Sequence, residues 1–483
     1  MNRRDFLKKC MAAGAGGFVL SNQALEVRAG AERPNILLIT ADDMNYDSPG
    51  VYGCGISDIT PNIDRLAAEG LRFTHSHITI AVCQPSRSVL MTGRYPHRNG
   101  AEGFEPIDTA VPTLQEQLRS AGYINGIMAK NSHLVPRAKF CWDYYIEGGE
   151  LGRGRDPSLY YKYAREFFED ATAAGKPFFL MANSQDPHRP FAGSQQEQNK
   201  WKTHLPYSRK IAPEEAEVPG FLPELKDVRQ EVSEYFTSVH RCDQTVGQVL
   251  RALKDTGFED STLVMFLSDN GIALPFAKTN CYLSSTRTPW IVRWPGVVKP
   301  GTVDTEHFIS GIDYMPTILD AVGLPQVGGM DGTSFVPLLT GAGRKNRDKV
   351  FTVFHETSAK RRYEMRCVQN KKFGYIYNAW SDGQTVFKNE SQSGLTMNAM
   401  KQAANTDPDI AARVQLFLYR VPEELYDFES DPDALHNLAD DPIYQQQLAT
   451  MRQELLAWME STNDALVSGY RRFLFSSGVK TRG

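Results

Sequence analysis

The chain has 483 residues, of which 41% are hydrophobic and 23% are charged, and its formal net charge is -4. This length accommodates one large and one smaller domain, or two comparable ones, in an ordinary globular enzyme. A weakly negative chain has no general basic field for nucleic acid, so any attraction of a polyanionic substrate must be local. No stretch holds the roughly 20 apolar residues that span a bilayer, which argues against stable membrane insertion.

The first 31 residues have the character of an export signal. Residues 3–8, Arg-Arg-Asp-Phe-Leu-Lys, are typical of a twin-arginine signal. A weakly apolar stretch follows at 11–20, and small residues at 27–31 offer cleavage sites; the alternative is a frayed amphipathic helix. We expect the twin-arginine machinery of a bacterium to export the folded chain, which would make the protein periplasmic or secreted.

Beyond the signal, apolar runs alternate with helical segments. Buried strands are predicted at 35–40, 71–74, 123–129, 177–182 and 263–267, and helices are predicted to begin at 60–61 and to cover 86–92, 113–120 and 232–254. This order predicts an α/β fold with a large, mostly parallel sheet flanked by helices. The polar, proline-containing stretch 190–223 is predicted to form a loop over the active face.

The pattern changes after residue 341. A basic linker at 344–349 leads to shorter strand-like runs at 350–354 and 373–377, and a final helix is predicted at about 441–461. We therefore predict a larger catalytic domain at 32–345. A smaller α+β domain at 346–483 would contribute to the substrate pocket.

Acidic and amide side chains stand at the ends of two predicted strands. Asp42 and Asp43 follow the first strand, and Asp269 and Asn270 follow a late one. Ligands of open α/β sheets bind at the carboxyl ends of the strands, and these oxygen donors suit calcium or magnesium. Either pair alone is also compatible with an ordinary turn or helix cap.

One cysteine lies in a distinctive setting, Cys83-Gln84-Pro85-Ser86-Arg87, followed by Thr92-Gly93. A cysteine nucleophile normally needs a histidine or a cationic site to become a thiolate. The run resembles the signature of the type I sulfatases, in which a maturation enzyme converts the cysteine to formylglycine. The resemblance implies an alkaline-phosphatase-like fold and a formylglycine-generating enzyme as partner. It further implies a divalent ion, calcium with magnesium as alternative, bound by Asp42, Asp43, Asp269, Asn270 and modified Cys83.

The same resemblance assigns roles to cationic residues. Arg87, one helical turn after Cys83, would reach back to the aldehyde hydrate, and Asp269 would help to deprotonate the hydrate. Two lysines and two histidines would bind the sulfate oxygens and move protons: Lys130, His133, His188 and Lys278. His188 or Lys278 would protonate the leaving atom and His133 would act as the later base. Many sulfatases have Lys-x-His, whereas here two residues separate Lys130 from His133, so the loop would have to bulge.

A narrower resemblance concerns the substrate. The short loop from Asp269 to Lys278 is similar to that of the heparan N-sulfatases (sulfamidases), which have arginine where this chain has Lys278. Residues 186–189 and the region of His355, Glu356 and Arg366 also resemble that group, which would make these three residues substrate contacts. The charges at 360–362 are equally compatible with a solvated face.

We therefore expect a sulfatase that acts on a sulfated saccharide, with N-sulfated glucosamine of heparin or heparan fragments as the first candidate substrate. The alternatives are an O-sulfatase for another sulfated glycan of algal or mucin type and a phosphodiesterase or phosphonate hydrolase of the same superfamily. A non-catalytic glycan-binding protein is the alternative outside enzymology. Apart from Cys10 and Cys83, five cysteines without CxxC spacing indicate no zinc site, and one disulfide remains open.

Overall fold

The computed structural model describes residues 33–343 and 346–476, so the predicted signal at 1–31 lies outside the described residues. Its larger part is built on an eight-stranded sheet of order β4-β3-β5-β1-β6-β7-β2-β8. The strands are β1 (Asn35–Asp42), β2 (Leu71–His77), β3 (Ile124–Met128), β4 (Tyr144–Ile146), β5 (Phe178–Pro187), β6 (Thr262–Ser268), β7 (Trp290–Arg293) and β8 (Thr302–Ser310). β7 runs antiparallel to both neighbours and the other pairs are parallel, so the predicted α/β fold is confirmed.

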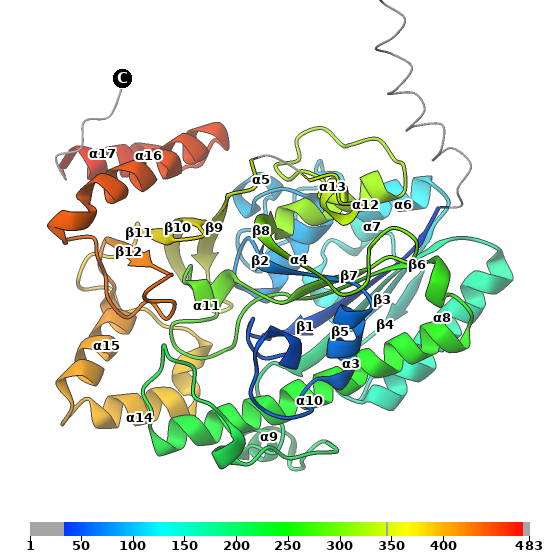
Figure 1. The fold of residues 1–483 in the computed structure, drawn as a ribbon, viewed down its shortest axis with the longest axis horizontal. Helices are drawn as coiled ribbons and strands as arrows, with labels where there is room; N and C mark the ends of the chain where they lie inside the picture. The colour runs from blue at the N-terminus through cyan, green and yellow to red at the C-terminus, as the bar shows by residue number, and fades with distance from the viewer. Residues whose placement is uncertain (1–32, 344–345, 477–483) are drawn as a thin grey trace, which may run out of the picture.

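Helices cover both faces of this sheet (Figure 1). One face carries α3 (Pro61–Ala68), α8 (Pro157–Ala174) and α10 (Lys226–Asp255), and the other carries α4 (Cys83–Thr92), α6 (Leu114–Ser120) and α12 (Tyr314–Ala321). Leu37 and Ile39 of β1 pack into the first core, whereas Ile36 and Leu38 pack into the second. This alternation follows from the two-residue period of a strand and explains why β1 reads as continuously apolar.

Shorter helical turns connect these elements. They are α5 (Pro96–Asn99), α7 (Arg137–Phe140), α9 (Gln195–Trp201), α11 (Leu283–Thr286) and α13 (Val336–Leu339), with 3-10 turns at η1 (Gly50–Tyr52), η2 (Asn131–His133), η3 (Pro213–Glu215), η4 (Glu259–Ser261), η5 (Gly311–Asp313), η6 (Glu390–Ser393) and η7 (Pro442–Tyr444). None of the helices within the described residues is both long enough and apolar enough to cross a membrane. The six described cysteines are free thiols.

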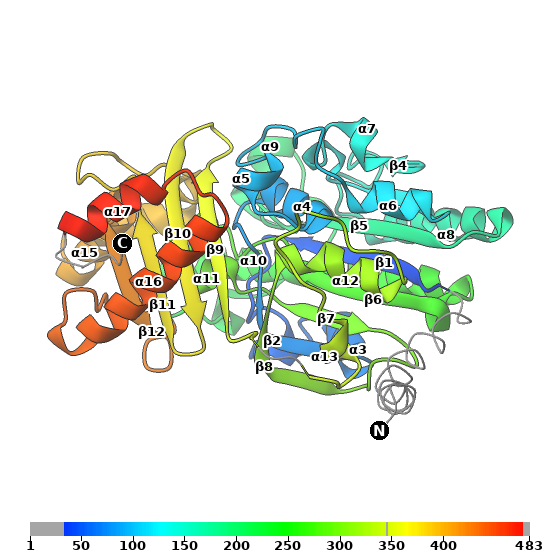
Figure 2. The ribbon, with the colours of Figure 1, turned by 90° about the horizontal axis from the view of Figure 1, so that it is seen from above.

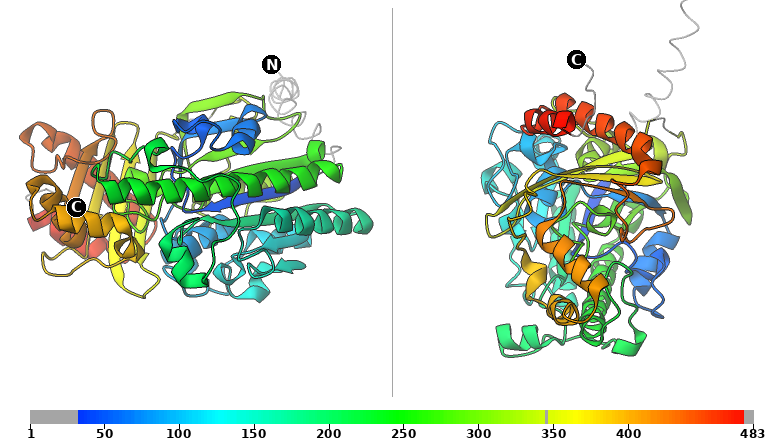
Figure 3. Two further views of the ribbon diagram at one scale, coloured as in Figure 1. Left: turned by 90° about the horizontal axis from the view of Figure 1, so that it is seen from below. Right: turned by 90° about the vertical axis from the view of Figure 1, so that its left-hand side faces the viewer.

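The smaller part is an antiparallel sheet of order β12-β11-β10-β9. Its strands are β9 (Lys349–Glu356), β10 (Arg362–Asn370), β11 (Phe373–Asn378) and β12 (Glu423–Asp427), and its helices are α14 (Leu395–Ala403), α15 (Pro408–Tyr419), α16 (Gln445–Ser461) and α17 (Val467–Ser476). Figures 2 and 3 show α16 and α17 across one face of this sheet, with α14 and α15 on the other side. The predicted smaller α+β unit is confirmed, while the exact boundary at 345 stays a prediction because residues 344–345 are not described.

Three local expectations differ from the structure. α4 begins at Cys83 itself rather than after it, because Pro85 falls in the first turn, where a missing N–H removes no helical hydrogen bond. The predicted last helix ends at Ser461, but α17 follows it. The stretch 190–223 contains α9 and packs along α10, where Ser238 Oγ accepts a hydrogen bond from the Ala192 amide (2.7 Å). Polar side chains of α10 thus bind this segment, and within the described residues it does not line the cavity that holds Cys83.

Candidate active site

The register of β1 and β6 brings the acidic strand ends together. The two strands are parallel neighbours with Ala41 opposite Ser268, so Asp42 and Asp43 lie beside Asp269 and Asn270. The Asp43 amide donates to Asp269 Oδ1 (3.2 Å), and Asn270 Nδ2 donates to Asp43 Oδ1 (2.7 Å). All four side chains are fully buried. The two pairs therefore form one site, as the strand ends predicted.

Arg87 lies beneath this group. Its guanidinium donates to Asp269 Oδ2 (2.6 Å), Thr40 Oγ1 (2.9 Å) and Asn183 Oδ1 (2.7 Å), and the side chain is fully buried. A buried carboxylate requires such a partner, and these three bonds fix the guanidinium below the cavity. The structure shows Arg87 holding Asp269 in place, while Arg87 Nε has no hydrogen-bond partner among the described residues, so its reach toward residue 83 stays a prediction.

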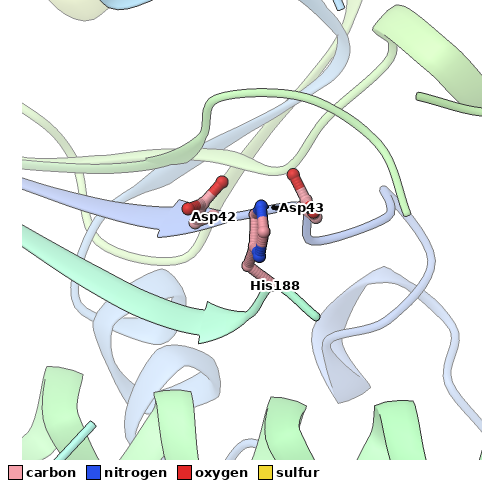
Figure 4. A group of neighbouring side chains, drawn as sticks. All are labelled: Asp42, Asp43 and His188. Carbon is pink, nitrogen blue, oxygen red and sulfur yellow. Dashed lines mark ion pairs between the residues drawn. The ribbon is translucent and has the colours of Figure 1, made fainter. Parts of the chain in front are cut away.

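The donor set of this site fits a divalent cation. Asp42 Oδ1 and Asn270 Oδ1 are buried and have no hydrogen-bond partner among the described residues. Asp42, Asp43 and His188 each offer a ligand atom, and these atoms lie within 4.8 Å of one another (Figure 4). Burial raises the pKa of Asp43 to about 7, a cost that a bound cation would offset. Unsatisfied carboxylate and amide oxygens are what calcium or magnesium would bind.

Cys83 opens into a cavity of about 590 Å³ that it shares with Lys130, His133, His188 and Lys278. Cys83 is the first residue of α4 and is 6% exposed. Burial raises the pKa of its thiol to about 12, so an unmodified Cys83 is protonated at neutral pH. Because the thiolate is the nucleophilic form of cysteine, this environment does not activate the thiol itself.

The loop after β3 brings Lys130 and His133 into the same cavity. Lys130 has a left-handed φ of 54° and its ammonium contacts the Asp42 carboxylate. The turn η2 then shortens the path from Asn131 to His133, which accommodates the additional residue between lysine and histidine. Burial lowers the pKa of Lys130 to about 7 and holds that of His133 well below its usual range, so His133 is neutral.

His188 and Lys278 approach the carboxylates at the strand ends from two other elements. Lys278 Nζ lies 2.7 Å from Asp43 Oδ1 and 2.6 Å from Glu390 Oε1. Burial alone would lower the pKa of Lys278, but these two carboxylates hold it well above its usual range. His188 Nδ1 lies 2.6 Å from the Arg189 carbonyl oxygen, so Nδ1 carries the proton and Nε2 stays free toward Asp43 Oδ2 at 3.9 Å.

The expected substrate contacts from the C-terminal part lie elsewhere. His355 is 1% exposed and its Nδ1 pairs with Glu364 Oε2 (2.9 Å), while Arg366 binds both carboxylate oxygens of Asp464 (2.5 and 3.2 Å). Within the described residues, neither these two side chains nor Glu356 lines the cavity of Cys83. Arg366 points into the C-terminal core because a buried guanidinium needs the Asp464 partner, so it stabilises that unit instead of facing substrate.

Other C-terminal residues close the cavity. They come from the connection between β9 and β10 and from the segment before and at the start of η6, namely Thr357, Ser358, Ala359, Arg361, Lys388, Asn389 and Glu390. We call these residues the rim. Asn389 Nδ2 donates to Thr279 Oγ1 (2.7 Å), which ties the rim to the loop that carries Lys278. No motif or periodicity in the sequence marks these residues, because docking of a second sheet brings them to the site. The charge pattern places Arg361 only among the charges at 360–362.

Comparisons with known proteins agree with this geometry. The sequence matches the family described as Sulfatase over residues 34–324 and the family described as N-sulphoglucosamine sulphohydrolase, C-terminal, over 274–404. It is 30% identical to human N-sulphoglucosamine sulphohydrolase, covering 90% of this chain and 91% of the relative. It is 28% identical to an ulvan-active sulfatase of Formosa agariphila, covering 90% and 76%, respectively.

Solved structures show the same fold. The structure of BT4656 in complex with its substrate D-glucosamine-2-N,6-O-disulfate superposes with a TM-score of 0.67 at 19% identity, covering 90% of this chain and 99% of that one. Another, described as BT1596, a 2-O GAG sulfatase, superposes with a TM-score of 0.69 at 20% identity, covering 90% and 94%. At these identities the superpositions support the fold and leave the substrate of this chain to the site itself.

Proposed function

The chain belongs to the sulfatase family, and from this premise we propose that it hydrolyses the N-sulfate of glucosamine in heparin or heparan fragments. The observation that best supports this proposal is the cavity that places Cys83 and four basic side chains next to a buried set of oxygen donors. The match to human N-sulphoglucosamine sulphohydrolase, which extends over nine-tenths of both chains, supports the choice of substrate. The family match to the C-terminal region of that enzyme covers rim residues as well.

We propose that residue 83 is formylglycine in the active protein and that its hydrate supplies the oxygen that attacks sulfur. The raised pKa of the Cys83 thiol supports this conversion, because the thiol would be a poor nucleophile at neutral pH. Asp42, Asp43, Asp269 and Asn270 would hold a calcium ion, which supplies charge for binding the sulfate oxygens. Mass spectrometry of the mature protein tests the conversion directly, since an unmodified Cys83 peptide in active protein would contradict it.

The other cavity side chains would bind sulfate and move protons. Lys130 and Lys278 approach from opposite elements, and a largely desolvated ammonium attracts an anion more strongly than an exposed one does. His188 holds its Nδ1 proton on a carbonyl, so Nε2, which carries no proton in the neutral ring, would first take up a proton and then deliver it to the leaving nitrogen. His133 is neutral and its buried Nδ1 has no partner among the described residues, which suits a base.

The rim supports an acidic glycan as substrate. Arg361 and Lys388 are exposed and line the cavity, and neither forms an ion pair within the described parts of the chain. Unpaired cations at the mouth of a cavity attract polyanions, although the chain as a whole is weakly negative. A heparin fragment carries carboxylates and further sulfates next to its N-sulfated sugar, which these cations would meet.

An O-sulfatase acting on another sulfated polysaccharide is the second candidate. The similarity to an ulvan-active sulfatase, which covers the same share of this chain, favours it. The buried oxygen donors and the basic side chains of the cavity would serve either substrate, because both substrates present the same sulfate group.

Sulfate release from defined saccharides separates the two candidates. The panel contains N-sulfoglucosamine, an N-sulfated heparin disaccharide, glucosamine 6-sulfate and O-sulfated galactose, with Cys83→Ala as the inactive control. We expect release from the N-sulfated sugars. Release from O-sulfated sugars alone would sink the N-sulfate assignment and leave the fold and the site intact.

Maturation and export complete the proposal. A formylglycine-generating enzyme would act on the Cys83 motif, and twin-arginine export would place the protein in the periplasm or outside the cell. Expression with and without residues 1–31, followed by cell fractionation, tests the export step. Full-length protein that stays in the cytosol of a bacterium with this machinery would contradict it.

A further inference from the structure

Glu390 is an unexpected residue in a cavity that binds an anion. Among the described residues that line the cavity it is the one carboxylate, and it stands among Lys130, His188 and Lys278. A negative charge next to a sulfate site opposes sulfate binding, so its presence requires a compensating role. Lys278 already has Asp43 as a partner at 2.7 Å, and therefore does not need a second carboxylate to neutralise its single charge.

The position of Glu390 is fixed by its neighbours. It begins η6, whose preceding residue Asn389 donates to Thr279 Oγ1 (2.7 Å) and accepts from Ser391 Oγ (2.8 Å). Its Oε1 lies 2.6 Å from Lys278 Nζ. Its Oε2 lies 3.9 Å from His188 Nε2, too far for a direct hydrogen bond. The side chain is 30% exposed, so Oε2 keeps hydrogen-bonding capacity toward the cavity beside the nitrogen of His188.

We propose that Glu390 determines specificity by binding the amino group that sulfamate cleavage releases, and this inference rests on the proposed N-sulfatase function. When the S–N bond breaks, the bonding electron pair stays on nitrogen. The nitrogen, which already carries one hydrogen, takes one proton that His188 Nε2 relays from solvent and a second proton directly from solvent, and becomes an ammonium group. Glu390 Oε2 then accepts a charge-assisted hydrogen bond from that ammonium group next to His188.

An O-sulfate gives a different outcome at the same place. Cleavage of its S–O bond releases a neutral hydroxyl group, which gains little from a nearby carboxylate. Glu390 therefore favours a leaving amine over a leaving alcohol while it disfavours the sulfate group itself. Removal of the Glu390 charge should therefore weaken the binding of the released amine and strengthen the binding of the released sulfate.

Competitive inhibition of the formylglycine-containing, calcium-loaded enzyme by glucosamine, glucose and inorganic sulfate tests the inference. In Glu390→Gln we expect the inhibition constant of glucosamine to rise about tenfold, because one charge-assisted contact is lost. The inhibition constant of sulfate should fall by roughly threefold, because the repulsion between sulfate and the Glu390 carboxylate is removed, and the inhibition constant of glucose should stay constant. Glu429→Gln is the matched control, since Glu429 is 64% exposed in the C-terminal part and pairs with Lys372 outside the cavity.

Two results overturn the inference. The first is an inhibition constant for glucosamine that does not change in Glu390→Gln. The second is a rise in the inhibition constants of both glucosamine and sulfate, because a joint rise means that Glu390 only positions Lys278. Thermal unfolding checks that the variant folds, and Glu390→Asp, which keeps the charge, should retain a preference for glucosamine over glucose. If neither variant folds, equal inhibition of the unaltered enzyme by glucosamine and glucose still refutes the inference.

The assay also separates this inference from the proposed function. If the enzyme releases sulfate only from O-sulfated sugars, the N-sulfatase function fails, yet the inhibition constants can still be measured with that substrate. If N-sulfate is hydrolysed but the constants do not move as expected, the function stands and the role of Glu390 fails.

Discussion

The floor and the rim of the cavity are built in different ways. The floor, comprising Asp42, Asp43, Arg87, Asp269 and Asn270, is fully buried, and hydrogen bonds join all of these side chains except that of Asp42 across two neighbouring parallel strands and α4. The rim belongs to the C-terminal part and contains exposed residues such as Ser358, Arg361 and Lys388. Sheet register fixes the floor and domain docking fixes the rim. We therefore propose that the floor carries chemistry common to sulfatases and that the rim governs the choice of substrate.

Breaking the floor should have the largest effect. In Arg87→Gln, Asp269 loses its guanidinium partner at 2.6 Å while it stays buried. Removal of one member of a buried pair costs about 3–5 kcal/mol, so we expect the free energy of unfolding to fall by that amount and sulfate release to fall by at least about a hundredfold. Chemical denaturation and initial rates measure the two effects.

Arg65→Gln is the control for this variant, because Arg65 is 58% exposed and pairs only loosely with Glu69 at 3.9 Å. It should change stability by less than about 0.5 kcal/mol. A loss below about 1 kcal/mol in Arg87→Gln would show that the floor does not depend on this pair.

Removal of the metal should have the next largest effect. The unpartnered oxygens of Asp42 and Asn270 predict that chelation abolishes sulfate release and lowers the unfolding temperature. Calcium at about 100 times its dissociation constant should restore roughly 2.7 kcal/mol of stability. Differential scanning calorimetry with calcium, magnesium or chelator measures this effect and compares the two ions. Equal unfolding temperatures in all three conditions would contradict a metal-binding floor.

Changes at the rim should act on substrate binding alone. The double variant Arg361→Ala/Lys388→Ala removes two exposed cations that line the cavity. We expect KM for a heparin disaccharide to rise about tenfold at low salt, kcat to stay within about twofold, and the salt dependence of KM to weaken. Lys401→Ala, an exposed change on α14, should leave KM unaltered. A fall in kcat with unchanged KM would mean that the rim also shapes the floor.

The junction behind the rim should respond to pH, with the smallest effect. His97 packs against Tyr95 and against Trp458 of α16, and burial lowers its pKa to about 4. Since an unfolded histidine titrates near 6.5, the unfolded chain binds the proton first and stability falls as pH drops from 6.5 to 4. We expect His97 to contribute on the order of 1 kcal/mol to this loss of stability, because its ring is partly exposed.

His97→Phe tests this contribution, since neither ring nitrogen of His97 has a hydrogen-bond partner among the described residues. The loss of stability between pH 6.5 and pH 4, measured by denaturation, should become smaller in the variant. An identical loss in both proteins would assign the acid sensitivity to other histidines, such as the half-buried His75, whose pKa partial burial also lowers to about 4.

The sequence predicted that the two acidic pairs of the floor lie together, because each of its signals is local, while their role as metal ligands stays a prediction. A buried apolar strand followed by Asp42 and Asp43 and a second followed by Asp269 and Asn270 placed both pairs at the same edge of a parallel sheet, where the structure has them. The spacing of Lys130 and His133 left their arrangement open, and the turn η2 resolves it. The sequence does not predict the contact of Arg87 with Asp269, because it does not reveal that Asp269 is buried; the reach of Arg87 toward residue 83 stays a prediction.

The sequence by itself determined the family, the parallel sheet and the candidate site side chains at its strand ends, because strand periodicity and short motifs depend on neighbouring residues. Only the tertiary structure decided which C-terminal residues reach the cavity. His355 and Arg366 lie in the core of the smaller unit, whereas Arg361 and Glu390 reach the site from its loops. The physical reason is that contacts between two separately built sheets depend on how their surfaces dock, and docking leaves no periodic trace in the chain.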